Sequence, residues 1–476
     1  MRRFLVILLA SVSVAACVSA PPTTPSQVEI KSDRLGLSGT QTPAISDTWW
    51  TAFGDKQLDD LVAQALSGNP SLQVALARMR QAQSELSSVR AGTYPQITGD
   101  AQEQRQYFSK SYIIPPPYGG TTQWIGTAQA NLSWSLDFWG KQQSQVDKAR
   151  SEAEAAALDA TAARLALAGS VTQAYISLWR AYVLRDVADD AVKQRESVFN
   201  LTASRVKSGL ENKASEKQSE ALLAMEREDL VRAKANVDLA EHQIASLIGR
   251  GADVYGHIAR PQLAENALAL PDTLPADLLS RRADIEAARA RIAAAMAGRE
   301  VARKAFYPDV NLMAFAGFAA IGLSPMFSAQ SLTYGAGPAI HLPIFDAGKL
   351  RADYAGATAE LDAAVADYNA SVVGAVKEAA DALTQLRSLQ DQAGEQRAAL
   401  AASEDSFRLA QSRYRNGLNP QLNVLDAENT LLQARRQQAT IDSDLAAQRV
   451  TLLMALGGGF GSETKISSAN QDMSHE

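Results

Sequence analysis

Residues 122–138 read TQWIGTAQANLSWSLDF, and this stretch decides the fold. Polar side chains occupy its odd positions with the single large exception of Ile125, whereas apolar or small side chains occupy the even ones. An alternation of period two is typical of a β-strand with one apolar and one polar face. The large and small apolar members of the even face are Trp124, Ala128, Ala130, Leu132, Trp134, Leu136 and Phe138.

Three further segments alternate in the same way. In the first of them, residues 95–107, Glu103 and Arg105 interrupt the less polar face. If this face contacts lipid, we expect these two charged residues to lie outside the hydrocarbon layer. In the last of them, Pro338 and Pro343 each remove a hydrogen-bond donor, which weakens the prediction of that strand's ends. The four predicted strands span residues 95–107, 122–138, 308–320 and 331–346.

The sequence around these strands occurs twice. LSWSLDFWGK at 132–141 corresponds to IHLPIFDAGK at 340–349, and RVKSGL at 205–210 corresponds to RYRNGL at 413–418, with the same offset of 208 residues. Because several landmarks keep one register, we interpret each half as a repeat of one unit. That unit runs helix, β-hairpin, long helix, turn, helix.

The long helix of the first copy is indicated by what the sequence lacks. No proline occurs between Pro117 and Pro261, and Gly169 is the only internal glycine of residues 140–208. A helix over this stretch is on the order of 100 Å long. Small residues recur at alternating steps of three and four from Val146 to Ala191, which favours close coiled packing of helices. The alternative is a simple coiled-coil dimer, in which Leu and Ile rather than Ala are expected at these positions.

Four strands with one apolar face cannot close a barrel, and open sheet edges are not tolerated in lipid. Two chains would give eight strands and a filled interior, whereas three chains give twelve strands and a lumen. We therefore predict a mainly α protein with a membrane β-barrel: a homotrimeric, twelve-stranded barrel that continues into a periplasmic α-helical barrel. Trp124, Trp134 and Phe138 are expected to form lipid-facing aromatic girdles. A soluble sandwich, the alternative, needs further strands, and none is predicted.

The N-terminus has the pattern of an exported lipoprotein. Residues 1–16 begin with Arg2 and Arg3, continue into an apolar run and end in small residues, as a secretory signal peptide does. Val14-Ala-Ala-Cys17 resembles the bacterial lipoprotein box, so we expect lipid attachment at Cys17. Val18 lacks the aspartate that often retains lipoproteins in the inner membrane, which favours the outer membrane. The alternative is an ordinary signal peptide followed by an incidental cysteine.

Composition and motifs exclude several functions. The chain has 46 Lys and Arg against 52 Asp and Glu, a net charge of −6, so no nucleic-acid partner is expected. One cysteine and four scattered histidines give no metal-binding cluster. No nucleophile elbow, zinc-protease helix or complete phosphate loop occurs, so we expect neither enzymatic activity nor a cofactor, apart from covalent diacylglycerol and acyl lipid on Cys17.

Together, the Cys17 box, the duplication, the glycines Gly140 and Gly348 at the strand-helix junctions and the Arg-x-x-x-Gly-Leu turns resemble the outer membrane factors, the TolC-like efflux family, in its lipoprotein branch. WWTAFGD at 49–55 and LPADLLSRRADIEAAR from Leu274 are similar to characteristic runs of that branch. The resemblance covers nearly the whole mature chain. Ala283 departs from it, since the family usually has proline there.

The resemblance implies a passive outer-membrane exit channel, lipid-anchored and extending into the periplasm. It implies a homotrimer that docks onto a periplasmic adaptor and a resistance-nodulation-division pump in the inner membrane, and that exports small toxic compounds or drugs. Two alternatives stay open. One is a non-channel periplasmic lipoprotein scaffold or adaptor, and the other is a type I protein-secretion conduit on the same fold.

The resemblance also implies a constriction after the second helix turn. Leu422 would form an apolar ring and Asp426 an acidic ring that attracts cations. The alternative makes Asp426 a solvated residue early in a helix. Asn429 stands where family members often have arginine, so the resemblance does not carry a salt-bridged lock to that position. Tyr414 resembles a gate-bracing tyrosine that hydrogen-bonds a neighbouring helix, with simple packing as its alternative.

The predicted organisation has six parts. These are a signal peptide at 1–16, a lipidated N-terminal segment at 17–57, a first repeat at 58–250, a linker at 251–273, a second repeat at 274–458 and a tail at 459–476.

Overall fold

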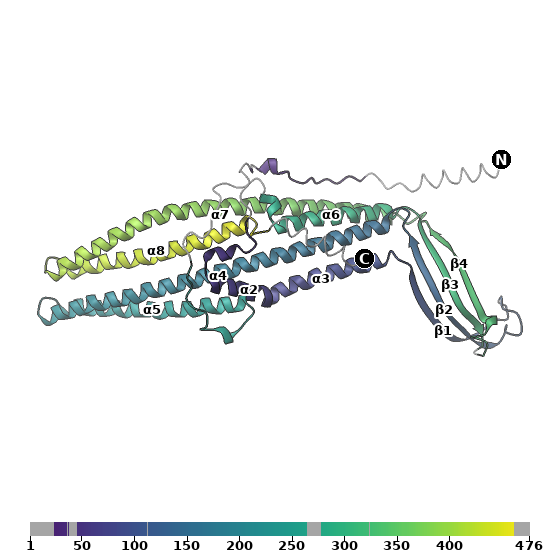
Figure 1. Cartoon of the computed structure of the whole chain (residues 1–476), viewed down its shortest axis with the longest axis horizontal. Coiled ribbons are helices and arrows are strands. Elements are labelled where there is room, and N and C mark those ends of the chain that lie inside the picture. Colours follow the sequence, from purple (N-terminus) through teal and green to yellow (C-terminus); the bar gives the residue numbers. More distant parts are fainter. Residues whose placement is uncertain are drawn as a thin grey trace. The chain divides into compact units, whose positions relative to one another are not determined.

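A computed structural model describes residues 23–35, 37, 45–111, 113–263, 278–322 and 324–460. It consists of long helices and one small sheet (Figure 1). The predicted signal peptide, Cys17, part of the linker and nearly all of the C-terminal tail lie outside the described residues. None of the helices within these ranges is both long and apolar enough to cross a membrane.

The sheet joins the hairpins of both repeats. Its order is β1-β2-β3-β4, and every neighbouring pair is antiparallel. Because β2 pairs with β3, the first hairpin and the second form a single surface. Within the part of the chain that the structure describes, β1 and β4 each pair on one side only. The strands are β1 (Gln96–Tyr107), β2 (Thr122–Leu136), β3 (Asp309–Ile321) and β4 (Leu332–His341).

The strand register places apolar residues of all four strands on one face. Leu132 lies opposite Ile97 on one side and Ala314 on the other, and Ala314 in turn lies opposite Ala336. Since opposite residues point to the same side of a sheet, this row is continuous. The other face is polar around β2, where the amide of Asn131 donates a 2.6 Å hydrogen bond to Asp100.

Two strands end earlier than predicted. β2 ends at Leu136 rather than 138, because the amide of Phe138 turns back to donate to the carbonyl of Leu136. β4 ends at His341 rather than 346, shortly before Pro343, which has no amide to continue a ladder. Pro338 lies inside β4, where an edge strand tolerates it.

The helices repeat with the offset seen in the sequence. α4 (Lys141–Lys207) and α7 (Lys349–Arg415) have 67 residues each, and α5 (Lys213–Leu247) and α8 (Gln421–Ala455) have 35 each. The shorter helices are α2 (Lys56–Gly68), α3 (Pro70–Ala91) and α6 (Ala283–Lys304). Short 3₁₀ turns lie at Ser32–Leu35, Trp49–Phe53, Ala252–Val254, Leu278–Arg281 and Ala329–Ser331.

Each long helix is followed by a tight turn and an antiparallel return helix (Figure 1). Gly209 has a φ of 73° and Gly417 a φ of 74°, which is the left-handed conformation that ends helices. The side chain of Asn212 then accepts a hydrogen bond from the Ser215 amide and begins α5. Contacts such as Glu196 with Arg227, at 2.5 Å, join α4 to α5.

The repeats do not coincide with compact units of the structure. One unit contains Arg78–Ala156 and Ala287–Tyr368, and the other contains Ile30–Ala77, Ala157–Glu286 and the chain from Asn369. Each unit therefore takes segments from both repeats. The physical reason in the first unit is the pairing of β2 with β3, and in the second it is the contact of α4 with α8, described below.

The second unit has the largest described hydrophobic core. Trp49 and Trp50 pack edge to face with 5.8 Å between ring centroids, beside α2 and the middle of α4. Tyr175 of α4 is fully buried there, and its hydroxyl donates a 2.6 Å hydrogen bond to Asp55. The core thus fixes the middle of α4, from which the helix runs on to the turn.

Candidate functional site

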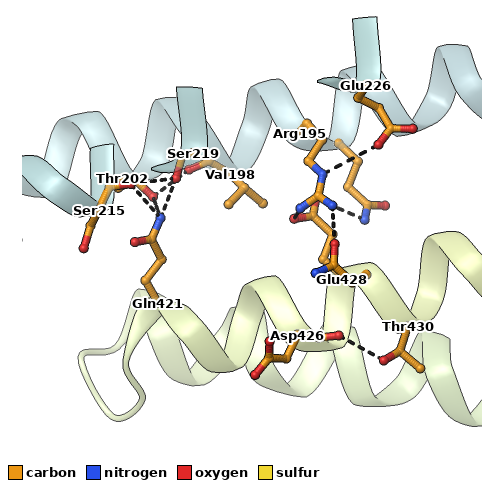
Figure 2. A network of polar contacts seen from close by, with 12 residues as sticks. Arg195, Val198, Thr202, Ser215, Ser219, Glu226, Gln421, Asp426, Glu428 and Thr430 are labelled. Carbon is orange, nitrogen blue, oxygen red and sulfur yellow. Dashed lines mark hydrogen bonds and ion pairs between the residues drawn. The ribbon is translucent and has the colours of Figure 1, made fainter. Parts of the chain in front are cut away.

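The predicted constriction residues lie on one face of α8. Leu422 and Asp426 are four residues apart, so their side chains share a face of the helix, and both are exposed in the single chain. Leu422 is 58% exposed. The backbone carbonyl of Asp426 accepts a 3.0 Å hydrogen bond from the Thr430 hydroxyl (Figure 2). This placement suits a ring of side chains around an axis, and whether they form it stays a prediction.

The opposite face of the same segment is buried. Gln421, Val424, Leu425 and Glu428 follow the spacing i, i+3, i+4 and i+7, and their exposed fractions are 5% or less. Val424 and Leu425 pack in one cluster with Val198 of α4 and with Tyr414. The start of α8 therefore presents one face to solvent and anchors the other to the first repeat.

Gln421 is a buried polar link to the first repeat. Its amide nitrogen donates to the hydroxyl of Thr202 in α4 at 3.0 Å and to the hydroxyl of Ser219 in α5 at 2.5 Å. All three residues are almost completely buried. Figure 2 shows the side chain reaching from α8 toward both helices. Because a buried amide without partners is costly, these contacts fix the register of α8 against α4 and α5.

Arg195 of α4 makes a second link two turns further along α8. One terminal nitrogen of its guanidinium donates to Glu428 at 2.6 Å, and the other donates to the side-chain oxygen of Asn429. Its Nε lies 3.9 Å from the carboxylate of Glu226 in α5. The side chain of Arg195 is 6% exposed and that of Glu428 is fully buried. One cation thus holds three helices together (Figure 2).

The electrostatic environment of Glu428 contains opposing effects. Burial is the largest and raises the pKa of Glu428 above its usual value, while Arg195 and Gln194 lower it. Arg436 of α8 adds a second cation, which contacts Glu226 and lies 3.1 Å from Asp229. The two arginines therefore face three carboxylates, of which Glu428 and Glu226 are buried, while Asp229 and Arg436 itself are partly exposed.

Tyr414 is fully buried at the end of α7. Its hydroxyl lies 3.5 Å from the carboxylate of Glu211, and the guanidinium of Arg205 lies 4.6 Å from the centre of its ring. Arg205 also donates to the backbone carbonyl of Tyr414 at 3.2 Å. Burial raises the pKa of the Tyr414 hydroxyl, so it is a neutral donor at physiological pH. These contacts are compatible with both interpretations, bracing and packing, and the bracing role stays a prediction.

Of the predicted girdle residues, Trp124 and Trp134 lie near the two ends of β2, and Phe138 lies two residues beyond it. Trp124, Trp134 and Phe138 are 43%, 37% and 66% exposed in the single chain. The indole nitrogen of Trp134 donates to the Thr93 carbonyl at 3.0 Å. Trp139, which the sequence patterns did not single out, stacks on Tyr307 with 5.1 Å between ring centroids. Contact of these rings with lipid stays a prediction.

Arg195, Gln421 and Glu428 were not predicted as site residues either, although the sequence contains a signal for Arg195. Continuing the steps of three and four beyond Ala191 leads to Arg195, Val198, Thr202 and Arg205. A charged residue on a seam of small residues predicts a buried partner. No signal of this kind pointed to Gln421 or Glu428, because no seam of small residues was predicted along residues 421–455.

Elsewhere in the described ranges, no group of three or more His, Cys, Asp and Glu side chains is arranged to hold a metal ion. Cys17, the predicted site of lipid attachment, lies outside these ranges.

Comparison with known proteins identifies the family. The family model "Outer membrane efflux protein" matches residues 61–250 and 274–458. The chain is 34% identical over 367 residues to the fusaric acid resistance protein FusA of Burkholderia cepacia, covering 75% of this chain and 69% of that protein. It is 29% identical over 444 residues to the multidrug resistance outer membrane protein MdtP of Escherichia coli, covering 92% and 90%.

Solved structures share the fold. The outer membrane protein VceC of Vibrio cholerae superposes with a TM-score of 0.82 at 33% identity, covering 87% of this chain and all of that one. The outer-membrane channel OprN gives a TM-score of 0.82 at 28% identity, covering 93% and 99%. With its duplicated helices, its shared four-stranded sheet and matches over most of both repeats, the chain belongs to the outer membrane efflux protein family.

Proposed function

We propose that this protein is the passive exit channel of a tripartite efflux system, working as a homotrimer in the outer membrane. It takes small toxic compounds or drugs from an inner-membrane pump of the resistance-nodulation-division class and a periplasmic adaptor. The relatives support this class of cargo, since they are named for resistance to fusaric acid and to multiple drugs.

The proposal rests on two features of the sheet, its continuous apolar face and its two unpaired edges. One row of apolar residues, Ile97, Leu132, Ala314 and Ala336, crosses all four strands, while β1 and β4 each lack a neighbour on their outer side in the described chain. In lipid, such open edges need partners. Three copies joined edge to edge provide them and enclose the polar face, with Asp100 and Asn131, as a wet lumen.

Directly after the turn that precedes α8, the exposed face of that helix gives the channel its constriction. Three copies place Leu422 and Asp426 in rings around the axis, where the acidic ring attracts cations. The buried face, with Gln421 and Glu428, holds these rings in position. The channel performs no catalytic step, and energy comes from the inner-membrane pump.

Cys17 anchors the protein to the outer membrane through diacylglycerol and acyl chains, with each buried CH₂ contributing about 0.8 kcal/mol. A Cys17→Ser variant tests this assignment. It should lose incorporation of radiolabelled palmitate, and full incorporation into the variant would contradict the assignment. Because the proposed barrel holds the chain in the membrane without the lipid anchor, we expect the variant still to fractionate with membranes.

Purified protein in planar bilayers tests the channel. We expect trimers that resist dissociation by detergent below the boiling point and that give discrete conductance steps. A non-conducting monomer would support the scaffold instead. Cells lacking the gene should become sensitive to small toxic compounds while still secreting proteins; loss of protein secretion with unchanged drug resistance would favour the type I secretion conduit.

A further inference from the structure

An open hollow of about 740 Å³ lies where the chain passes from β2 into α4. The end of α3, the end of β2 and the first turns of α4 form its walls, and all of them belong to one compact unit of the structure. Figure 1 shows α3 and α4 reaching the strands at this end of the sheet. The volume falls in the range of about 300–1,000 Å³ that is typical of sites for small ligands.

The apolar part of the lining continues the apolar face of the sheet. Trp134 lies two residues after Leu132, so both side chains point to the face that carries the apolar row. Leu136 comes next on this face, and Phe138 follows the end of the strand. The indole of Trp134 is held by its 3.0 Å hydrogen bond to the Thr93 carbonyl. The hollow therefore lies where the apolar face of the sheet ends.

Two arginines and one carboxylate form the charged part of the lining. Arg90, near the end of α3, is half-buried and makes no ion pair within the described part of the chain. Arg150 of α4 has 56% of its side chain exposed and lies 3.5 Å from Asp147, one turn earlier. Asp137 accepts a 2.8 Å hydrogen bond from the Gln143 amide through one of its oxygens. Both guanidinium groups and the second oxygen of Asp137 can therefore contact a ligand.

These charges are complementary to a headgroup that carries both a phosphate and an ammonium group. The paired N–H donors of a guanidinium, as in Arg90 and Arg150, match the oxygens of a phosphate. A primary ammonium has three donors, one of which can reach the carboxylate of Asp137. The face of an aromatic ring such as Trp134 also attracts a cation. A headgroup with only negative charge would instead be repelled by Asp137.

A membrane lipid presents such a headgroup at this level of the sheet. In the proposed channel the apolar face of β2 contacts hydrocarbon and the helices stand in the periplasm, so the hollow lies in the headgroup layer. Aromatic rings such as those of Trp134 and Tyr94 are typical of this layer. The strand residues of the lining come from β2, not from β1 or β4, whose outer edges would meet other copies. Joining three sheets edge to edge therefore does not cover the strand side of the hollow.

We infer that this hollow binds one phosphatidylethanolamine molecule from the membrane leaflet that faces the periplasm. Arg90 and Arg150 hold its phosphate, and Asp137 accepts a hydrogen bond from its ammonium group. Leu136 and Phe138 contact the glycerol and the first carbons of the acyl chains. The inference rests on the proposed membrane position of the sheet. The bound lipid fixes the depth of the barrel, because it joins the end of α3 and the start of α4 to the headgroup layer.

Lipid competition tests the headgroup. The full-length protein is purified in detergent, stripped of non-covalent lipid and mixed with equal amounts of phosphatidylethanolamine, phosphatidylcholine and phosphatidylglycerol that carry identical acyl chains. Native mass spectrometry counts each lipid that stays bound. We expect phosphatidylethanolamine to be enriched about five-fold over phosphatidylcholine, whose trimethylated nitrogen cannot donate to Asp137; this is the upper size of one exposed ion pair. Equal binding of all three lipids, or a preference for phosphatidylglycerol, overturns the inference.

Substitutions separate the phosphate contacts from the ammonium contact. Arg90→Gln combined with Arg150→Gln should bind less of all three lipids, whereas the two lysine substitutions at these positions keep both charges and should restore binding. Asp137→Asn keeps a side-chain oxygen for the Gln143 amide, so α4 still begins normally. It should bind lipid without preferring phosphatidylethanolamine to phosphatidylcholine. Arg80→Gln, at an exposed position of α3 outside the hollow, is the control and should bind like the unaltered protein.

The inference is overturned if the double glutamine variant binds as much lipid as Arg80→Gln, or if Asp137→Asn keeps the preference. A soluble headgroup distinguishes a lipid from a free phosphate ester. Glycerophosphoethanolamine lacks acyl chains and their contacts with Leu136 and Phe138, so an excess of it should leave the bound lipid in place. Complete displacement by this compound would overturn the assignment to a lipid.

Recording in planar bilayers keeps this inference and the proposed function apart. A protein that forms conducting trimers but shows no headgroup preference overturns only the lipid site. A protein that neither forms trimers nor conducts overturns the proposed channel itself.

Discussion

The guanidinium of Arg195 lies 2.6 Å from the carboxylate of Glu428, although the two residues are 233 positions apart and belong to different repeats. Neither side chain has more than 6% of its surface exposed. A buried pair of this kind adds little net stability compared with apolar residues, but loss of one partner leaves a buried charge uncompensated. The pair therefore fixes which surfaces of the two repeats meet.

Replacing Arg195 by methionine should lower the free energy of unfolding by about 3–5 kcal/mol, because Glu428 and Glu226 lose their shared cation. Urea unfolding of the detergent-solubilised protein, followed by circular dichroism, measures this loss. Arg227→Met is the matched control, since Arg227 and Glu196 are 59% and 43% exposed and such pairs contribute about 0–1 kcal/mol. Equal losses in both variants would contradict the role of burial.

The pH dependence of stability should reveal Glu428. Burial raises its pKa in the folded protein, so its contribution is fully present below the unfolded pKa and is lost as pH rises through the folded pKa. Relative to Glu428→Gln, the unaltered protein should therefore lose stability as pH increases from about 4.5 toward neutral. Urea midpoints across this range measure the difference. A relative gain would mean that the attraction of Arg195 outweighs burial.

Asp426→Ala should weaken block of the channel by divalent cations and change its resting conductance, because it removes the predicted acidic ring. Trimer assembly should be intact, since Asp426 lies on the exposed face of α8. Gln218→Ala, at the equivalent position of the first repeat, is the control and should leave block unchanged. If Asp426→Ala has no effect, the residue is only a solvated position early in a helix.

Leu132→Arg should impair membrane insertion, since a charge on the lipid face costs about 2–4 kcal/mol near the bilayer midplane. Ser133→Arg, one residue further, points to the opposite face and should insert normally. Heat-stable trimer in outer-membrane fractions measures insertion. The reverse result would show that the two faces of the sheet have been exchanged.

Sequence patterns predicted the elements better than their contacts. The absence of proline and the repeat predicted the lengths of α4 and α7, and the alternation at 122–138 predicted the position of β2. The absence of proline and the alternation are local properties, so the sequence shows them directly. The pairing of β2 with β3 and the link between Gln421 and Thr202 depend on how the two repeats meet. Both contacts join residues that are more than 170 positions apart in the sequence and become buried only when the repeats pack together. The periodicity within a single helix or strand cannot predict such contacts.

The antiparallel pairing of β2 with β3 also affects the timing of folding. Leu136 lies opposite Val310, and residues near 310 are made roughly 10–30 s after residues near 136 at typical synthesis rates. During this interval the backbone groups of β2 that pair with β3 have no hydrogen-bond partners, and the apolar face of the hairpin is exposed. Both features favour pairing with a wrong chain. We expect a holdase chaperone to bind the first hairpin after export. Depletion of this chaperone should make the protein aggregate before barrels whose paired strands are neighbours in the sequence are affected.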